Sequence, residues 1–207
     1  MMSTPNLFPF YQAIDQAGSA ESLRQAVIRL SDLRAEESIL KLIEALGYNN
    51  PGAAVAAVEG LIAIGRPAVE PLLGNIDGFD YGARAWANRA LAGIGDPRVL
   101  DNLCDASLSD FALSVRRAAT KGLGNIHWDW LAAAERPAAQ TRALQTLQQA
   151  IADEEWVVRY AAVVGLEGLG IQVAVHRDTV TDCLMTLGNT EPEQVVQLRI
   201  RQALARL

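Results

Sequence analysis

Hydrophobic residues recur along the chain at the spacing of an α-helix. The run from 115 to 126 shows this most clearly, because its apolar and small residues are separated by steps of three and one: Val115, Ala118, Ala119, Gly122, Leu123 and Ile126. Such steps place all six side chains on one face of a helix. The segments between these runs carry no strand signal, so the pattern predicts an all-α protein.

The helical pattern is repeated. Residues 51–65, 81–95, 113–126 and 156–170 share one arrangement of small, apolar and polar residues. A leucine near the end of each copy gives successive intervals of 30, 32, 43 and 38 residues: Leu61, Leu91, Leu123, Leu166 and Leu204. Periods of this length without strands indicate stacked helix pairs. The signature residues of tetratricopeptide and ankyrin repeats are missing. We therefore predict an α-α superhelix, a HEAT-like or armadillo-type solenoid of about six helix pairs.

The repeat also predicts the domain organisation, which is one solenoid over residues 1–207. We expect first helices near 35–46, 67–76, 97–107, 138–151 and 173–187. Their partners are expected near 51–64, 81–94, 112–126, 155–169 and 192–207. An irregular pair near 7–32 forms an N-terminal cap within residues 1–33. The 43-residue interval contains an insertion between repeats, at 125–137.

Several glycines have predicted roles in this array. Gly65, Gly95 and Gly170 follow the last apolar residue of a helical run, and we expect them to adopt the left-handed conformation that ends a helix. Gly122 and Gly165 lie inside helices, where glycine costs about 1 kcal/mol relative to alanine. They are better explained as places where a neighbouring helix comes close.

Arginines recur in one column of the repeat. Arg116 follows Asp110 by six residues and Arg159 follows Asp153 by six, which is typical of HEAT repeats. An acid near a helix N-terminus is favourable, and arginines of successive repeats can interleave with these acids as a ladder. We favour this structural role over a functional one. Arg84 is in the same column, but its nearest preceding acid, Asp80, is only four residues away.

Net charge and cysteine content argue against a nucleic-acid-binding protein and against a disulfide-rich one. The formal net charge is −6, so an electrostatic attraction to nucleic acid is not expected. Cys104 and Cys183 are 79 positions apart and do not suggest a disulfide framework, which fits a cytoplasmic protein. No signal peptide and no stretch of 18 apolar residues is present, so we expect no membrane insertion.

Enzymatic motifs are absent from the sequence. The two histidines, His127 and His176, have no partner at metal-ligand spacing, and no Walker loop, nucleophile elbow or dinucleotide-binding turn occurs. The run 127–130, His-Trp-Asp-Trp, could stack on a planar ligand or anchor a protein partner. Alternatively, both tryptophans fold the insertion onto the core, which we favour slightly. Trp86 matches Ala118 and Ala161 in the repeat, so we expect it to pack in the core.

Three segments carry a more specific likeness. Residues 47–61 (GYNNPGAAVAAVEGL), 80–98 (DYGARAWANRALAGIGDPR) and 109–119 (SDFALSVRRAA) resemble the F-type subunits of phycocyanin α-subunit phycocyanobilin lyases. The resemblance covers most of the chain and is best over 35–170. A related isomerising lyase carries an Asn-His-Cys-Gln-Gly-Asn motif that is absent here, which implies attachment without isomerisation.

The resemblance implies a lyase that is active with an E-type partner subunit, as a heterodimer. The pair would attach phycocyanobilin, as substrate, through a thioether to a cysteine of the phycocyanin α subunit. No permanently bound cofactor and no metal are implied. The nucleophilic thiol would belong to the acceptor, and the lyase would hold chromophore and thiol in one geometry. A non-catalytic repeat protein of phycobilisome assembly or disassembly is the alternative.

A bilin has two propionates, four pyrrolic nitrogens and a long conjugated plane. Arginines suit the propionates, a carboxylate suits the pyrrole N–H groups, and aromatic rings suit the plane. By chemical type, six residues are the expected bilin-binding candidates: Tyr81, Arg84, Arg89, Arg117, Trp128 and Asp129.

Overall fold

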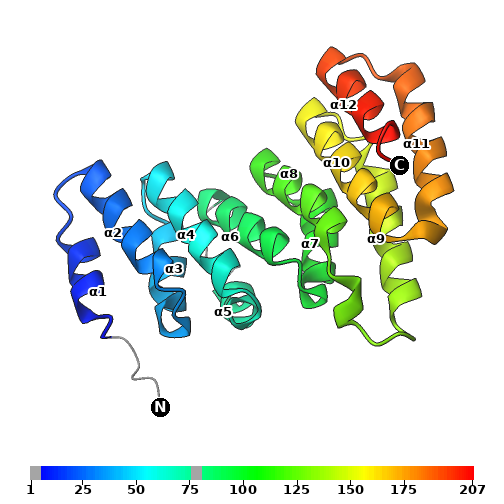
Figure 1. Cartoon of the computed structure of the whole chain (residues 1–207). Coiled ribbons are helices and arrows are strands. Elements are labelled where there is room, and N and C mark those ends of the chain that lie inside the picture. Colours follow the sequence, from blue (N-terminus) through cyan, green and yellow to red (C-terminus); the bar gives the residue numbers. More distant parts are fainter. Residues whose placement is uncertain (1–5, 76–80) are drawn as a thin grey trace. The chain divides into compact units, whose positions relative to one another are not determined.

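The computed structural model describes residues 6–75 and 81–207, and these residues form α-helices and short 3-10 turns with no strand. Twelve α-helices in the described residues make six consecutive pairs (Figure 1), which confirms the all-α helical-repeat prediction. Contacts divide the chain into two compact units, one up to Ile94 and the other from Gly95 to Leu207. Each unit is described by itself below, and the single-domain organisation stays a prediction.

The N-terminal unit contains three helix pairs. Its elements are α1 (Phe8–Asp15), α2 (Ala20–Asp32), η1 (Glu36–Ser38), α3 (Ile39–Leu46), α4 (Pro51–Ile64), η2 (Arg66–Ala68), α5 (Val69–Asn75) and α6 (Tyr81–Ile94). The second helices α2, α4 and α6 pack against one another in that order. Leucines supply the centre of the core, where the largest fully buried side chains are Leu30, Leu42, Leu46, Leu61, Leu72 and Leu91.

The C-terminal unit contains the other three pairs. Its elements are η4 (Pro97–Val99), α7 (Leu100–Ser109), α8 (Leu113–Gly122), η5 (Leu123–Asn125), η6 (Trp128–Trp130), α9 (Arg136–Ala150), α10 (Trp156–Gln172), η7 (Ala174–His176), α11 (Arg177–Thr190) and α12 (Gln194–Leu204). Here α10 packs between α8 and α12. The largest fully buried side chains are Leu103, Leu123, Ile126, Leu147, Leu166 and Leu169.

Of the three predicted glycine caps, two have the expected positive φ. Gly65 and Gly95 have positive φ, +79° and +67°, as expected after a helix, although the ψ of Gly65 (−134°) lies outside the left-handed helical region. The prediction for Gly170 is wrong, because α10 continues through it to Gln172. A Cβ at Gly170 would press against Leu207 and Val180, so this glycine serves close packing.

Glycine also permits two repeats to touch backbone to backbone. A Cβ on Gly165 would lie 2.8 Å from the carbonyl oxygen of Thr120, and one on Gly124 or Gly168 would collide with the backbone of the facing glycine. This confirms the predicted close approach at Gly165. It also shows why η5 and α10 can pack so tightly.

One asparagine links the second helices of the N-terminal unit. Asn50 caps α4, since its Oδ1 accepts from the N–H of Ala53 at 3.0 Å. Its Nδ2 donates to the carbonyl oxygen of Ala20 at the start of α2, at 2.7 Å. The arginine column is occupied in α4 by the buried Ala54. Uncharged groups connect these repeats instead: the Asn50 amide, and the Ser31 hydroxyl, which donates to the carbonyl oxygen of Ala56 at 2.8 Å.

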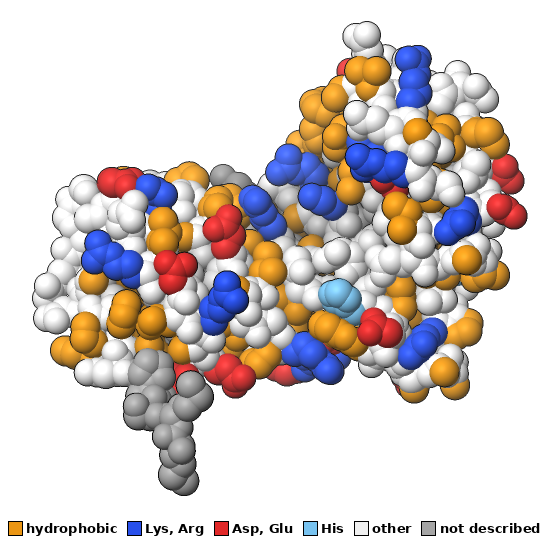
Figure 2. Space-filling view, in the orientation of Figure 1, with side chains coloured by type: hydrophobic (Ala, Val, Ile, Leu, Met, Phe, Trp, Pro, Cys, Tyr) orange, Lys and Arg blue, Asp and Glu red, His pale blue; other side chains and the backbone are white. Residues whose placement is uncertain are grey.

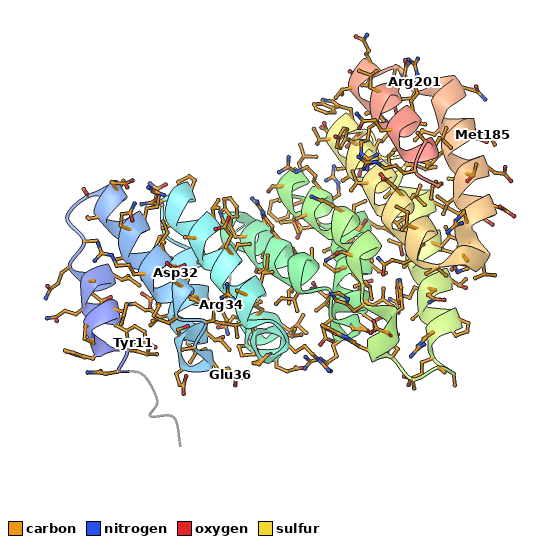
Figure 3. All side chains as sticks on the ribbon, viewed as in Figure 1. Tyr11, Asp32, Arg34, Glu36, Met185 and Arg201 are labelled. Carbon is orange, nitrogen blue, oxygen red and sulfur yellow. The ribbon has the colours of Figure 1, made fainter. Side chains whose placement is uncertain are left out.

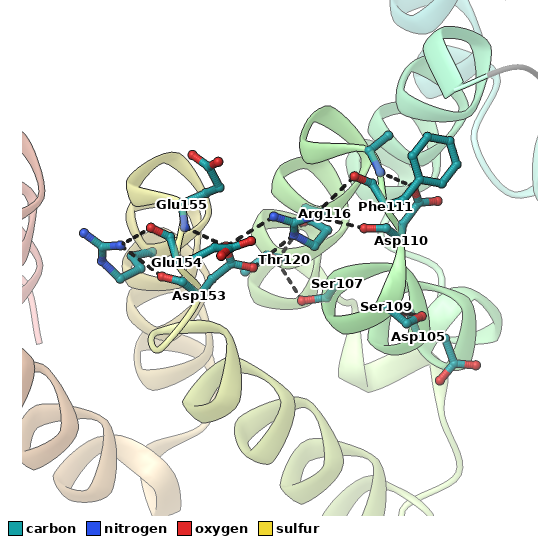
Figure 4. Close-up of polar contacts among 12 residues, drawn as sticks. Asp105, Ser107, Ser109, Asp110, Phe111, Arg116, Thr120, Asp153, Glu154 and Glu155 are labelled. Atoms are coloured by element: carbon teal, nitrogen blue, oxygen red, sulfur yellow. Dashed lines mark hydrogen bonds and ion pairs between the residues drawn. The ribbon is translucent and has the colours of Figure 1, made fainter.

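The C-terminal unit instead uses the predicted arginine ladder (Figure 4). The Arg116 guanidinium donates to the backbone oxygen of Asp110 at 3.1 Å and to the carboxylate of Asp153, in the next repeat, at 3.0 Å. Arg159 repeats the arrangement with the backbone oxygen of Asp153, at 2.9 Å, and the carboxylate of Glu191, at 2.7 Å. These side chains are 14% exposed or less. The structural role predicted for Arg116 and Arg159 is therefore confirmed.

The ladder ends at α12 with a different residue. Gln197 stands six residues after Glu191, in the arginine column, and its Nε2 donates to the backbone oxygen of Glu191 at 2.6 Å. The amide thus satisfies the turn of its own repeat, as the arginines do.

A second buried ionic contact joins α10 to α12. The Glu167 carboxylate accepts from Arg199 and, at 3.1 Å, from Arg206 close to the C-terminus. Glu167 and Arg199 are both buried. Burial by itself raises the pKa of Glu167, but the bonds from the two guanidinium groups outweigh it and the pKa is lowered. The last helix is therefore held by two buried carboxylates, Glu167 and Glu191.

The connection after α2 is strained. Arg34 has φ of +49°, a conformation that favours glycine, and its amide donates to the carbonyl oxygen of Ser31. The hydroxyl of Tyr11 donates to the backbone oxygen of Glu37 at 2.8 Å, which ties α1 to η1. Figure 3 labels Tyr11 and Glu36, the first residue of η1.

Breaking the ladder should destabilise the C-terminal unit. Replacing Arg159 with Met leaves the buried Glu191 carboxylate without its guanidinium, and we expect a loss of about 3 kcal/mol in the free energy of unfolding. Urea titration measures it. The control is Arg142→Met, which removes an exposed pair with Asp101 and should cost less than about 1 kcal/mol. Equal losses in the two variants would contradict the assigned role.

Acid should weaken the same connection. The Arg159 guanidinium lowers the pKa of Glu191, so folding is favoured above the unfolded-state pKa of about 4.3 and this contribution is lost as pH falls through the folded-state pKa. We expect the unfolding free energy to decrease on acidification below about pH 4.5. In Arg159→Met the decrease should be shallower, since Glu191 no longer has a lowered pKa. Parallel curves for the two proteins would rule this out.

Candidate functional site

Three of the six candidate residues lie on α6. The backbone of Tyr81 begins this helix, but its side chain is outside the described part of the chain. Arg84 is half-buried, and its carbonyl oxygen accepts from Nδ2 of the buried Asn88 at 3.0 Å. Arg89 is exposed, with its guanidinium carbon 5.5 Å from the centre of the Trp86 ring. Trp86 itself is half-buried rather than a full member of the core.

Arg117 on α8 is exposed and makes no hydrogen bond or ion pair with the described residues. Its neighbour Arg116 is fully committed to the ladder. Lys121, one turn further along α8, is likewise exposed and unpaired within the described chain. This face of α8 therefore offers two cations to an anionic ligand or partner.

The remaining two candidates, Trp128 and Asp129, lie in the insertion, which is a loop held by hydrogen bonds. The amide of His127 donates to the carbonyl oxygen of Gly95 at 2.8 Å. The Arg136 guanidinium donates to the carbonyl oxygens of Leu131, at 3.0 Å, and Asp129, at 3.1 Å. Glycine is required at position 95, because its φ is positive and a Cβ would collide with the carbonyl oxygen of Asn125.

The two tryptophans of the insertion have different environments. Trp128 is only 5% exposed, and its indole nitrogen has no hydrogen-bond partner among the described residues. Trp130 is 38% exposed and stacks on the His127 ring, with centroids 4.4 Å apart and an angle of 22° between planes. Asp129 is exposed between them. The prediction that tryptophan folds the insertion onto the core therefore holds for Trp128, whereas Trp130 belongs to the surface.

The six candidates are divided between the two units. Tyr81, Arg84 and Arg89 belong to the N-terminal unit, and the other three belong to the C-terminal unit. Only Trp128 and Asp129 are immediate neighbours, and Arg117 lies on the helix that leads into their loop.

A groove on the first helices of the C-terminal unit is lined by none of the six. It has a volume of about 620 Å³ and runs between α9 and α11, lined by Gln148, Ile151, Ala152, Thr179, Asp182, Cys183, Thr186, Leu187 and Thr190. Three hydroxyls, an amide and a carboxylate can bond to N–H groups. The signal in the sequence is the helical spacing of Thr179, Asp182, Cys183 and Thr186, which places polar side chains along one side of α11.

Both cysteines are free and poorly suited to act as nucleophiles. Burial raises the pKa of the Cys183 thiol, and burial also raises the pKa of Cys104. Thiols with raised pKa values stay protonated near neutral pH. Among the described residues, no group of three or more His, Cys, Asp or Glu is arranged to hold a metal ion.

In the part of the chain that the structure describes, no single helix is both long and apolar enough to cross a bilayer. The run from Pro51 to Asn75 meets the length and composition only as two helices bent by 116°.

The insertion should depend on Gly95. In Gly95→Ala the added Cβ disfavours the positive φ and collides with Asn125, so we expect the unfolding free energy to fall by about 1–3 kcal/mol. Quenching of tryptophan fluorescence should rise as Trp128 becomes accessible. The matched control is Gly18→Ala, whose Cβ meets nothing within 4 Å and should change stability by less than about 0.5 kcal/mol. An unperturbed Gly95→Ala protein would contradict this description of the loop.

The chain is similar to known proteins over nearly its whole length. No family model matches it. It is 50% identical over 197 residues to the phycocyanin alpha phycocyanobilin lyase CpcF of Synechocystis sp., covering 95% of this chain and 92% of that one. A solved structure, the complex of CpcE and CpcF of phycocyanin lyase from Nostoc sp. PCC7120, contains a chain that is 46% identical. The match has a TM-score of 0.77 and covers 81% of this chain and 98% of that one.

A more distant likeness concerns the fold alone. A designed armadillo repeat protein, 19% identical, matches with a TM-score of 0.51 over 98% of this chain and 100% of its own. The helical-repeat architecture, the paired second helices and the identity to lyase subunits agree with one another. The chain belongs to the family of phycocyanobilin lyase subunits, on the CpcF side of the CpcE–CpcF pair.

Proposed function

We propose that this chain is the F-type half of a heterodimeric lyase that attaches phycocyanobilin to a cysteine of the phycocyanin α subunit. Its similarity to a chain of the CpcE–CpcF complex, at 46% identity, is the observation that carries the proposal. The E-type subunit is the partner, phycocyanobilin is the substrate, and the cytoplasm is the compartment.

The reaction is an addition without a leaving group. The acceptor thiol adds to the ring-A ethylidene of the bilin, so that sulfur bonds to the exocyclic carbon and a proton goes to the adjoining ring carbon. The two thiols of this chain have raised pKa values, which supports assigning the nucleophile to the acceptor. The contribution of the lyase is then to hold chromophore and thiol in a reactive geometry.

The candidate residues have separate roles in this proposal. Arg84, Arg89 and Arg117 suit the propionates, and the exposed Asp129 suits the pyrrole N–H groups. Tyr81 is proposed to contact the conjugated plane. Trp128 contributes by anchoring Asp129, because its own ring is buried, and Trp130 offers the exposed ring in its place.

The groove between α9 and α11 is a second candidate position for the chromophore. Its volume of about 620 Å³ is in the range of ligand sites. Asp182 and three threonines suit N–H donors, but its lining includes no cation for the propionates.

Co-expression tests the function. The chain is produced with the E-type subunit, apo-phycocyanin α subunit and a source of phycocyanobilin, and covalent bilin is measured by zinc-induced fluorescence on a denaturing gel. We expect a strong gain in the correct adduct only when both lyase subunits are present. Omitting each subunit in turn is the control. If the yield and identity of the adduct are the same without this chain, the lyase function is wrong, and binding without transfer would favour the non-catalytic alternative.

Single substitutions test the candidate residues. We expect Arg117→Ala to weaken bilin binding to the heterodimer about fivefold to twentyfold, because an exposed cation that faces a propionate is lost. Absorption titration with phycocyanobilin measures the affinity. The control, Arg142→Ala, removes an arginine engaged by Asp101 and should leave binding unchanged. Equal affinities for Arg117→Ala and wild type would remove Arg117 from the site.

A further inference from the structure

An apolar stripe lies on the second helices of the C-terminal unit, and nothing in the described unit covers it. Trp156 at the start of α10 is 41% exposed, and Val195 and Leu198 on α12 are 42% and 50% exposed. The half-buried Tyr160 completes the set. We refer to Trp156, Tyr160, Val195 and Leu198 as the stripe.

The ladder fixes the register that brings these residues together. Arg116, Arg159 and Gln197 are equivalent positions on α8, α10 and α12, since each bonds to the turn six residues before it. Tyr160 and Leu198 each follow that position by one residue and therefore share a column. Trp156 lies four residues before Tyr160 on α10, and Val195 lies three residues before Leu198 on α12. Each pair therefore shares one face of its helix. The stripe is consequently continuous across two packed helices.

Unpaired cations lie on α12 and on α8, the helix that packs against α10 beside the stripe. In the described C-terminal unit, eight arginines have hydrogen-bonding or ionic partners, among them Arg116, Arg159 and Arg199. The cations without any such partner are Arg117, Lys121 and Arg201, and all three lie on second helices. Lys121 is on α8, and Arg201 is three residues after Leu198 on α12. Figure 2 shows Lys and Arg side chains beside hydrophobic ones in this part of the unit, and Figure 3 labels Arg201 on α12.

This combination fits a protein surface better than a small molecule. A small ligand needs a concave site that covers most of its area, and neither cavity described in this chain includes a stripe residue. Exposed apolar side chains bordered by polar ones are typical of protein-binding surfaces. Cations that remain unpaired in a chain of net charge −6 call for an acidic partner.

The size of the stripe distinguishes between a permanent and a transient partner. Obligate interfaces are large and strongly apolar, whereas transient ones combine a few apolar anchors with a polar rim. Four partly exposed side chains with cations at the border match the transient kind. A lyase must release its modified acceptor after each transfer, so the acceptor is its transient partner.

We propose that the stripe, with Lys121 and Arg201, docks an acidic, partly apolar surface of the phycocyanin α subunit. This inference rests on the proposed function, which supplies the acceptor. It goes beyond that function by assigning the face on which the acceptor binds. Arg117, the bilin-binding candidate on α8, lies in the same column as Tyr160 and Leu198, on the helix next to α10, so docking there brings the acceptor beside a cation proposed to hold the chromophore.

Two double variants test the docking surface in the complete heterodimer. Val195→Ser with Leu198→Ser removes apolar contact, and Lys121→Glu with Arg201→Glu reverses charge. We expect each to weaken binding of apo-phycocyanin α subunit at least about tenfold by biolayer interferometry. The charge variant should also show a flatter dependence of affinity on salt.

Matched controls come from the N-terminal unit. Arg29→Glu with Arg34→Glu makes the same change in net charge at exposed positions, and Leu40→Ser removes a leucine that is 68% exposed. Both should bind the acceptor within about twofold of wild type. Heterodimer formation, followed by size-exclusion chromatography, and phycocyanobilin affinity should be unchanged in the stripe variants.

The outcomes separate this inference from the proposed function. Wild-type affinity for the acceptor in both double variants, apolar and charge-reversed, would overturn the inference, even if bilin transfer proceeds. Loss of the heterodimer would assign the stripe to the E-type subunit, and selective loss of bilin affinity would assign it to the chromophore; each overturns the inference. If wild type transfers no bilin but the stripe variants lose acceptor binding, the lyase function fails and the docking surface stands.

Discussion

The buried pairing of arginine with carboxylate between neighbouring repeats is the interaction on which the C-terminal unit depends. Each ladder arginine bonds to the turn of its own repeat and to the carboxylate of the next. Desolvated charges of this kind have a strong requirement for geometry, because a partner shifted by one helical turn would leave a carboxylate unpaired in the interior. The ladder therefore sets the register of α8, α10 and α12. This register decides which side chains of these helices are exposed.

Much of this architecture could be predicted because its causes are local. The six-residue separation of Asp110 from Arg116, and of Asp153 from Arg159, is a property of one turn and one helix. The helix periods likewise follow from side chains three and four positions apart. By contrast, Gly170 has the same sequence context as the cap glycines Gly65 and Gly95. Its position inside α10 is explained by packing against Leu207 and Val180, which are distant in sequence.

The candidate site also combines features that the sequence predicts with features that only the fold decides. The insertion could be located by the length of the interval, but its two tryptophans are indistinguishable by type. Only the fold decides that Trp128 is buried and that Trp130 stacks on His127 at the surface. The groove between α9 and α11 needs two helices that are separated by a third in the chain. The fold also decides which arginines are paired. Arg116 and Arg117 are adjacent in sequence, yet Arg116 bonds within the scaffold and Arg117 is available to a ligand.

The glutamine at the end of the ladder bears on self-association. In a helical-repeat array, a helix that offers an unpaired guanidinium in this column can bond to an acid of another copy of the chain, head to tail. Head-to-tail contacts of this kind do not close, so they lead to filaments rather than to defined oligomers. Gln197 satisfies its own turn through an amide and carries no charge toward a following repeat. At this position of α12 an uncharged amide therefore replaces the guanidinium found on α8 and α10, and it offers no charge for such a head-to-tail contact.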